Sequence, residues 1–314
     1  MQKQPVHIHL YKQTARRLGL QVTIVKLGRI ATNNILISNG SKCCVLSPTK
    51  TGFYPRTTAW FKTVCNSKTL SQEVLKKAGY KTIRSNLFHH TDSKSVVELQ
   101  AKLAKNEKFP ILVKPEEGRD GQGITISNSQ NELLKAGTNL FKQQLSFMTQ
   151  NIESGCEYRI LLVNNSVMLM HLKEFPFVLG NGVSTISELL ETASDPIDNG
   201  FLKNHLKQNK MTLSTITAIG KKIPYHITKK SSLGYYKTNN FPKVTEKWAL
   251  QLAKKLNTQT VGIDVFIDDF ANTDSYRIIE INANPGFMYI KNRYNDNVTP
   301  NRIVEKVLRD YFNL

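Results

Sequence analysis

Two neighbouring segments in which apolar and polar residues alternate constrain this chain most: VGIDVFIDD at 261–269 and YRIIEINANPG at 276–286. A period of two predicts strands, and the short connection between them predicts an antiparallel hairpin. The pattern places these apolar side chains on one face of the hairpin: Ile263, Val265, Ile267, Ile279 and Ile281. It places these polar side chains on the other face: Asp264, Glu280 and Asn282.

The polar face of this hairpin predicts a metal site. If the hairpin closes symmetrically about Asn272, Asp264 lies across from Glu280, and Asn282 lies one pleat further along. Carboxylate and amide oxygens are hard ligands, and they suit Mg²⁺ together with the oxygens of a bound phosphate. Taken alone, the segment also fits an ordinary hairpin whose acids are solvated.

A glycine-rich segment at 111–124, ILVKPEEGRDGQGI, predicts a phosphate site. The apolar run into Lys114 predicts a buried strand, and Gly118, Gly121 and Gly123 predict a turn. The backbone N–H groups of such a loop can bind phosphate oxygens, and the lysine supplies a countercharge. The loop is not a P-loop, because no Gly-Lys-Ser/Thr follows it. It is not the dinucleotide fingerprint, because a short strand, ITIS, follows instead of a helix.

Five blocks, taken in order, resemble the ATP-grasp superfamily, and within it the ligase domains of cyanophycin synthetase and of the bifunctional glutathione-forming enzymes. The resemblance covers roughly residues 66–290. Its blocks are NSKTLSQEVLKKAGY (66–80), VKPEEGRDGQGI (113–124), SGCEYRILLVNNSVM (154–168), FPFVLGNGVSTISELLE (175–191) and VGIDV…IIEINANPG. The order of the blocks makes the resemblance specific for the superfamily and less specific for the substrate.

The resemblance implies an α/β (α+β) ATP-grasp fold in three parts. A small N-terminal α/β lobe is expected at 1–65, a central lid subdomain at 66–150, and a C-terminal lobe with the metal site at 151–314, with ATP bound between the last two. Local patterns predict helices near 11–18, 68–78, 93–105, 129–141, 184–192 and 244–256, a strand at 21–27, and hairpin turns at Asn39-Gly40 and Asn164-Asn165. Thr299-Pro300 predicts the start of the last helix.

The resemblance also implies roles for individual residues. Lys68 and Lys114 match the lysines that hold the α- and β-phosphates of ATP, and Gly118, Gly121 and Gly123 match the lid. The hinge that binds adenine matches Gln150, Asn151, Ile152 and Glu153. Glu157 matches the acid that holds the ribose hydroxyls.

The resemblance also implies which residues bind the metal ion and which residue is catalytic. Asp264, Glu280 and Asn282 match the Mg²⁺ ligands, and Mn²⁺ can take the same ligands. Arg159 matches a catalytic arginine near the γ-phosphate or the acyl phosphate, where a guanidinium stabilises developing charge. For Glu157 and Arg159 the alternative is that they form cross-strand pairs on a solvated face.

The substrate side of the chain departs from the family pattern. Glu174 stands where an arginine is common, Gly180-Asn181-Gly182 replaces GDG, and SSLG at 231–234 lacks the usual paired glycines. The seven histidines show no catalytic spacing, so none of them is given a role. These departures affect the acceptor half of the expected site and leave the nucleotide half intact.

Charge is the second unusual feature of the chain, whose net charge is +19. Residues 1–72 contain eleven Lys or Arg and no acid, and residues 201–243 contain nine Lys and no acid, with turn residues and no clear helical or strand period. The two acid-free zones predict an anionic partner: an acidic substrate, a polyanion or nucleic acid. We find no long apolar run and no signal peptide, so we expect a cytoplasmic protein without a membrane partner. The four cysteines have no metal-ligand spacing, and the oligomeric state stays open.

Together these observations predict an ATP- and Mg²⁺-dependent carboxylate–amine ligase. It would form an amide through an acyl phosphate, release ADP and phosphate, and act on an amino acid or an acidic peptide. Two alternatives stay open: an ATP-dependent modifier of a protein or peptide acceptor, and a polyanion- or nucleic-acid-binding protein on a degenerate ATP-grasp scaffold.

Overall fold

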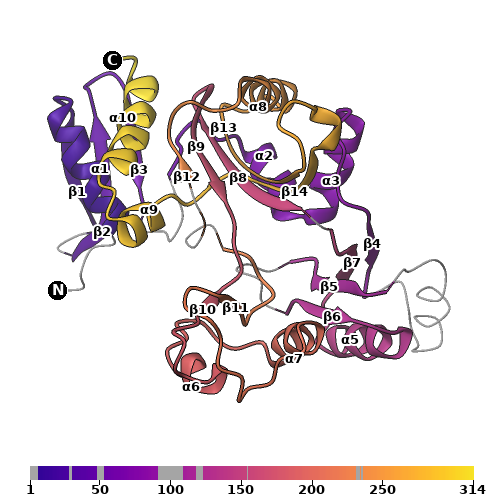
Figure 1. Ribbon diagram of the computed structural model, residues 1–314. Helices are drawn as coiled ribbons and strands as arrows, with labels where there is room; N and C mark the ends of the chain where they lie inside the picture. The colour runs from indigo at the N-terminus through magenta and orange to yellow at the C-terminus, as the bar shows by residue number, and fades with distance from the viewer. Residues whose placement is uncertain are drawn as a thin grey trace.

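A five-stranded antiparallel sheet forms the centre of the fold (Figure 1). The computed structural model describes residues 6–27, 30–47, 53–90, 109–117, 123–153, 155–230, 234 and 236–314. In the central sheet the strand order is β12 (Tyr236–Lys237), β9 (Ser166–Leu172), β8 (Cys156–Val163), β13 (Thr260–Ile267) and β14 (Arg277–Asn282). Three helices pack on one face of this sheet: α2 (Ala59–Asn66), α3 (Lys68–Lys77) and α8 (Lys243–Lys255). The core between them holds Trp248, Leu252, Ile263 and Ile281.

The β13–β14 hairpin has the register that the alternation predicts at its inner end. Asp264 pairs with Glu280, and Gly262 pairs with Asn282, so the hairpin is symmetric about Asn272 there. A register shift follows between Asp264 and Val265. Because of that bulge Ile278, and not Ile279, joins the apolar face, so the predicted position of Ile279 was wrong.

A second, four-stranded sheet carries the strand–loop–strand that was predicted around Lys114. Its strand order is β4 (Ser85–Phe88), β7 (Phe147–Asn151), β5 (Ile111–Pro115) and β6 (Thr125–Ser127), and α5 (Gln130–Lys142) packs on it. Gly118, Gly121 and the helix expected near 93–105 lie outside the described residues. Gly123 has a φ of +73°, and a Cβ there would lie 2.8 Å from Pro115 Cγ, so this turn requires glycine.

The two ends of the chain pack together (Figure 1). A three-stranded sheet of β1 (Gln21–Leu27), β2 (Ile30–Ser38) and β3 (Cys43–Leu46) shares one core with α1 (Val6–Arg17), α9 (Tyr289–Tyr294) and α10 (Val298–Phe312). Acids of α10 pair with the basic N-terminal region, in Arg17–Glu305 at 2.7 Å and Arg56–Asp310 at 3.0 Å. The acid-free first zone is therefore partly neutralised by distant residues.

The expected cap of the last helix was wrong by a few residues. Thr299 and Pro300 lie inside the first turn of α10, and Asp296 caps it from outside. The carboxylate of Asp296 accepts hydrogen bonds from the backbone N–H groups of Val298, at 2.7 Å, and Thr299, at 3.0 Å. Asp296 therefore supplies the side chain that satisfies the free N–H groups of the first turn.

A small subdomain contains part of the lysine-rich zone. It consists of β10 (Phe177–Leu179), β11 (Lys222–Pro224), α6 (Ile186–Leu190) and α7 (Asn199–Gln208). Sequence reading found no regular element at 201–243, yet α7 covers its start, with Leu202 and Leu206 one turn apart in the core. The short η1 (Thr273–Ser275) connects β13 to β14. Among the described helices, none is long and apolar enough to cross a membrane.

Candidate nucleotide and metal site

One end of the central sheet carries a cluster of charged and amide side chains on the face opposite α8, which we call the charged sheet face. Its members are Glu157, Arg159, Lys173, Asp264, Glu280 and Asn282. Further along the same face of β8, Leu161 and Val163 pack into the core of the terminal lobe. The sheet face is thus apolar at one end and ionic at the other.

Asp264 and Arg159 form a bidentate ion pair across neighbouring strands. Arg159 Nε lies 2.6 Å from Asp264 Oδ1, and Arg159 Nη2 lies 2.5 Å from Asp264 Oδ2. Asp264 is 1% exposed, so it is not a solvated acid. Burial raises the pKa of this carboxyl, but the positive charges of Arg159 and Lys173 outweigh burial and hold the pKa well below its usual value. The pair gives the guanidinium a fixed orientation.

The donor set at the end of β14 fits a hard cation. Glu280 lies across from Asp264, and Asn282 Nδ2 lies 3.3 Å from Glu280 Oε1. Both oxygens of Asp264 are bound by Arg159, so Glu280 and Asn282 carry the more open oxygens. Among the described residues, no group of three His, Cys, Asp or Glu side chains is placed to hold a metal ion. Gly262 leaves room for Pro285, whose Cβ lies 2.7 Å from where a glycine Cβ would stand.

Glu157 is also buried and ion-paired, with Lys173. The Lys173 ammonium donates to Glu157 and lies 3.5 Å from Asp264 Oδ2, so it bridges two carboxylates. Burial lowers the pKa of Lys173, and the two carboxylates more than compensate, so the pKa is raised. Glu157 and Arg159 therefore do form cross-strand pairs, but Glu157 is buried and Arg159 is partly buried, so the setting is not a solvated face.

Lys114 reaches the site from the four-stranded sheet. Its ammonium donates to Gln150 Oε1 at 2.8 Å, and both residues are buried. Burial lowers the pKa of Lys114 to about 8, while the carboxylate of Glu280 acts in the opposite direction. Lys68, the first residue of α3, donates to the backbone carbonyl of Glu116 at 2.7 Å. The structure thus brings both predicted phosphate lysines to the start of the glycine-rich loop.

The expected adenine hinge follows β7. The side-chain oxygen of Gln150, the first residue of this hinge, accepts the hydrogen bond from Lys114. Its Nε2 is buried and has no hydrogen-bond partner among the described residues. Ile152 is 45% exposed, and Glu153 pairs with Arg277 at 3.1 Å. An orphaned amide beside an exposed apolar side chain suits the edge and face of a base.

Acids from other segments neutralise part of the lysine-rich zone. Lys222 pairs with Glu174 at 2.8 Å, and Lys230 pairs with Asp195. Lys229 differs, because its ammonium lies 5.0 Å from the ring centre of Phe175 and 5.1 Å from that of Phe266. Burial lowers the pKa of Lys229, against the attraction of Glu157. Ser231 to Leu233 lie outside the described residues.

His171 is a residue that sequence reasoning missed. It is fully buried on β9 opposite Arg159, and its Nε2 lies 2.7 Å from the carbonyl oxygen of Gly234. Its Nδ1 lies 3.3 Å from the hydroxyl of Tyr289, and the Tyr236 and Tyr294 rings flank it. Burial lowers the pKa of His171 to about 4, so the ring is neutral near pH 7. Only the cross-strand register could have pointed to this position.

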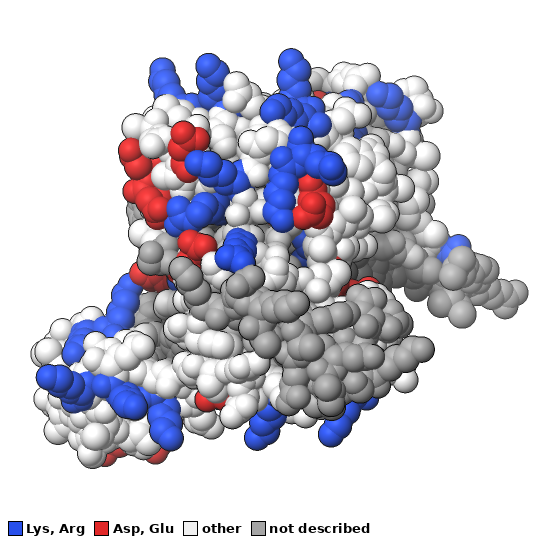
Figure 2. Space-filling view, turned by 90° about the vertical axis from the view of Figure 1, so that its right-hand side faces the viewer, with Lys and Arg blue, Asp and Glu red and all other residues white. Residues whose placement is uncertain are grey.

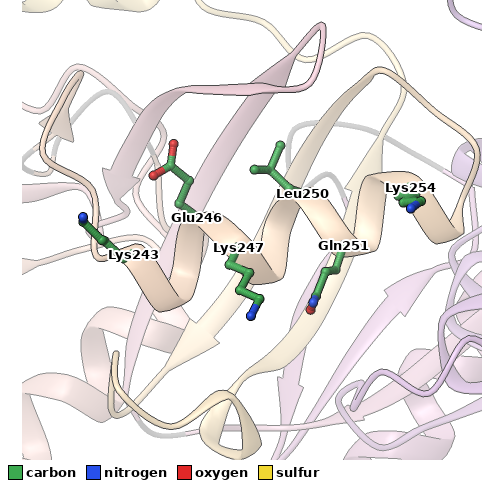
Figure 3. Close-up of a pocket in the computed structure, with 6 residues that line it drawn as sticks. All are labelled: Lys243, Glu246, Lys247, Leu250, Gln251 and Lys254. Carbon is green, nitrogen blue, oxygen red and sulfur yellow. The ribbon is translucent and has the colours of Figure 1, made fainter.

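A hollow lies along α8 (Figure 3). Its lining residues all come from that helix: Lys243, Glu246, Lys247, Leu250, Gln251 and Lys254. The buried side of α8 packs on the apolar face of the central sheet, so this hollow is on the outer surface. Figure 2 shows a separate feature of the surface. Lys and Arg side chains are spread over the face in view, with fewer Asp and Glu side chains between them.

The chain resembles known proteins in sequence and in structure. No model of a known protein family matches the chain. It is 27% identical over 277 residues to the glutathione biosynthesis bifunctional protein GshAB of Clostridium perfringens, which covers 81% of this chain and 35% of that protein. It is 26% identical over 241 residues to the cyanophycin synthetase of Geminocystis herdmanii, which covers 69% of this chain and 27% of that protein.

Among solved structures, a bifunctional glutathione synthetase from Pasteurella multocida superposes with a TM-score of 0.57 at 19% identity. The match covers 98% of this chain and 43% of that one. At this identity the likeness establishes a shared fold. The chain spans about a third of the length of the C. perfringens relative.

Proposed function

Given that the chain has the ATP-grasp fold and is related in sequence to the bifunctional glutathione biosynthesis proteins and the cyanophycin synthetases, we propose that it is an ATP-dependent carboxylate–amine ligase. The observation that carries the proposal is the charged sheet face. There the buried Asp264 pairs with the partly buried Arg159 beside Glu280, and Lys114 extends toward them from the other sheet. Such an arrangement of cations and oxygen ligands suits the transfer of a phosphoryl group.

The nucleotide would bind between the two sheets. Lys68 and Lys114 would hold the α- and β-phosphates, and the loop with Gly118, Gly121 and Gly123 would close over them. The hinge at 150–153 would hold the base. Glu157, which is paired with Lys173, would accept hydrogen bonds from the ribose hydroxyls.

Glu280 and Asn282, with Asp264 behind them, would hold Mg²⁺ or Mn²⁺. The bound cation would neutralise charge on the β- and γ-phosphate oxygens. This assignment relies on the oxygen-only donor set and on the half-buried position of Glu280.

The reaction would proceed in two displacements. A substrate carboxylate oxygen bonds to the γ-phosphorus while the bond to the β-phosphate oxygen breaks, which leaves ADP and an acyl phosphate. An amine nitrogen then bonds to the acyl carbon, the carbon–oxygen bond to phosphate breaks, and the amine loses a proton. Arg159, oriented by Asp264, would stabilise the charge that develops in both steps.

The substrate class is proposed to be acidic. Among the lysines of the 201–243 zone, Lys229 is held close to Glu157 and Lys173, while Lys222 and Lys230 are paired with acids. A half-buried ammonium between two aromatic rings favours a second carboxylate on the substrate, as in a glutamyl or aspartyl peptide.

A screen of amino acid and dipeptide pairs for ATP-dependent phosphate release tests the proposed function. We expect release only with Mg²⁺ or Mn²⁺ present, and we expect Glu280→Gln to lose most of it while keeping the fold, because the apolar face of the hairpin is untouched. Glu246→Gln, on the outer surface of α8, is the matched control. Full phosphate release by Glu280→Gln would refute the metal assignment.

The substrate class has its own test. Lys229→Glu is expected to raise the Michaelis constant for an acidic substrate about tenfold, on the scale of one desolvated charge pair. Lys247→Glu on α8 serves as the control for net charge. If neutral substrates turn over as well as acidic ones, and Lys229→Glu affects neither, the acidic-substrate proposal is wrong.

A second candidate function is polyanion or nucleic-acid binding, favoured by the net charge of +19 and by the outward lysines of α8. Salt-dependent binding of random oligonucleotides without any ADP release would support it. The acids of the charged sheet face are evidence against this second function. Their carboxylates would repel the phosphates of a polyanion unless a bound cation offset that repulsion.

A further inference from the structure

Glu116 makes an unusual set of contacts at the start of α3. Its carboxylate accepts hydrogen bonds from Ser67 Oγ at 2.7 Å, from Thr69 N at 3.0 Å and from Thr69 Oγ1 at 2.8 Å. Its backbone carbonyl accepts a fourth from Lys68 Nζ at 2.7 Å. Three consecutive residues of one helix start thus bind a single residue, which is only 9% exposed.

These contacts join two separate parts of the fold. Ser67 and Thr69 open α3, whose Leu75 packs into the core under the central sheet. Glu116 directly follows β5, the strand of the four-stranded sheet that carries Lys114. The Glu116 side chain is therefore a cross-link between the two layers at the point where the two lysines come together.

Elementary electrostatics explains why an acid suits this position. The first turn of a helix has free N–H groups and a partial positive charge, so a carboxylate there is stabilised. Ser67 also caps the helix by accepting a hydrogen bond from Leu70 N at 3.1 Å while it donates to Glu116. The hydroxyl is thereby fixed from two sides, and with it the backbone from which Lys68 extends.

We propose that Glu116 is a positioning residue for nucleotide binding, which acts by fixing Lys68 relative to Lys114. This inference rests on the proposed ATP site. The two ammonium groups must hold neighbouring phosphates, so their separation matters, and they sit on different layers. Glu116 sets that separation, and the glycine-rich loop begins two residues after it. Nothing in the contacts of Glu116 requires it to touch the nucleotide itself.

Calorimetric titration of Mg-ATP into wild type, Glu116→Gln, Lys68→Met and the double variant tests the inference. We expect Glu116→Gln to bind Mg-ATP about tenfold more weakly, on the scale of one charge-assisted hydrogen bond. In the Lys68→Met background the same change is expected to have little further effect, because Glu116 acts through Lys68. With saturating ATP, kcat should change less than KM.

Glu132→Gln is the matched control. Glu132 is also an acid at a helix start in the same sheet layer, bound to Asn128 on the surface, and its loss should leave Mg-ATP affinity unchanged. Glu116→Asp, which keeps the charge, covers the case in which Glu116→Gln does not fold.

The possible results of the titrations distinguish a failure of the positioning role from a failure of the proposed function. Wild-type affinity in both Glu116 variants, or a tenfold loss that is fully additive with Lys68→Met, overturns the positioning role while the proposed function stands. A wild-type protein that does not bind Mg-ATP overturns the proposed function and this inference together.

Discussion

Lys114 is a buried cation whose charge depends on pH in an accessible range. Burial lowers its pKa to about 8, so it is mostly charged at pH 7 and mostly neutral at pH 9. Because the charged form is the one that binds phosphate, Mg-ATP affinity is expected to be nearly full at pH 7 and below. Above pH 8 it should fall by up to about tenfold per pH unit.

Titration of Mg-ATP binding between pH 6.5 and 9.5 checks this dependence. Lys114→Arg is the control, because a guanidinium keeps its charge over the whole range. An identical inflection near pH 8 in wild type and Lys114→Arg would assign the titration to another group.

His171 makes a prediction about stability. Its folded pKa of about 4 lies below the ordinary value of 6.5, because burial disfavours the charged ring. Between these values the unfolded chain binds the proton more readily than the folded one. The stability from the neutral ring is therefore complete above pH 6.5 and decreases as pH falls toward 4. The expected loss is about 2 kcal/mol between pH 7 and pH 5.

Urea unfolding at pH 7 and pH 5 measures that loss. His171→Asn keeps a side chain that can accept from Tyr289 but cannot titrate. Between pH 7 and pH 5, the free energy of unfolding of His171→Asn should therefore fall by about 2 kcal/mol less than that of wild type. Equal losses in the two proteins would mean that His171 is not a buried neutral ring.

At the scale of elements, the β13–β14 hairpin shows what alternation can and cannot predict. The alternation of apolar and polar residues predicted which side chains share a face of β13. It also predicted the pairing of Asp264 with Glu280, since both are local consequences of strand geometry. The bulge after Asp264 was not predictable, because no glycine or proline marks it in the sequence. It exchanged the roles of Ile278 and Ile279.

This exchange gives a direct test with two adjacent residues of the same type. Ile278 is fully buried, so Ile278→Ala is expected to lower the free energy of unfolding by about 2–5 kcal/mol. Ile279 is only partly buried, so Ile279→Ala should cost clearly less. Chemical denaturation of both variants measures the two losses in the free energy of unfolding. A larger loss for Ile279→Ala than for Ile278→Ala would show that β14 has the unshifted register.

For the whole molecule, the fold could be predicted from the order of the five blocks, and the ATP-grasp fold is confirmed by the structural likeness. The contacts that join segments distant in the sequence could not be predicted. Glu116 with the start of α3, Lys222 with Glu174, and Arg17 with Glu305 all depend on how the layers pack. The lysine-rich zone appeared unneutralised for the same reason, because its partner acids lie elsewhere in the sequence.

The central claim is that two layers bring cations and oxygen ligands together to transfer the γ-phosphate of ATP to a carboxylate. The most direct measurement is chromatography of the nucleotide after turnover with a substrate pair found in the screen. The account predicts ADP and free phosphate, each in amounts equal to the amide formed. AMP with pyrophosphate as the products would contradict it.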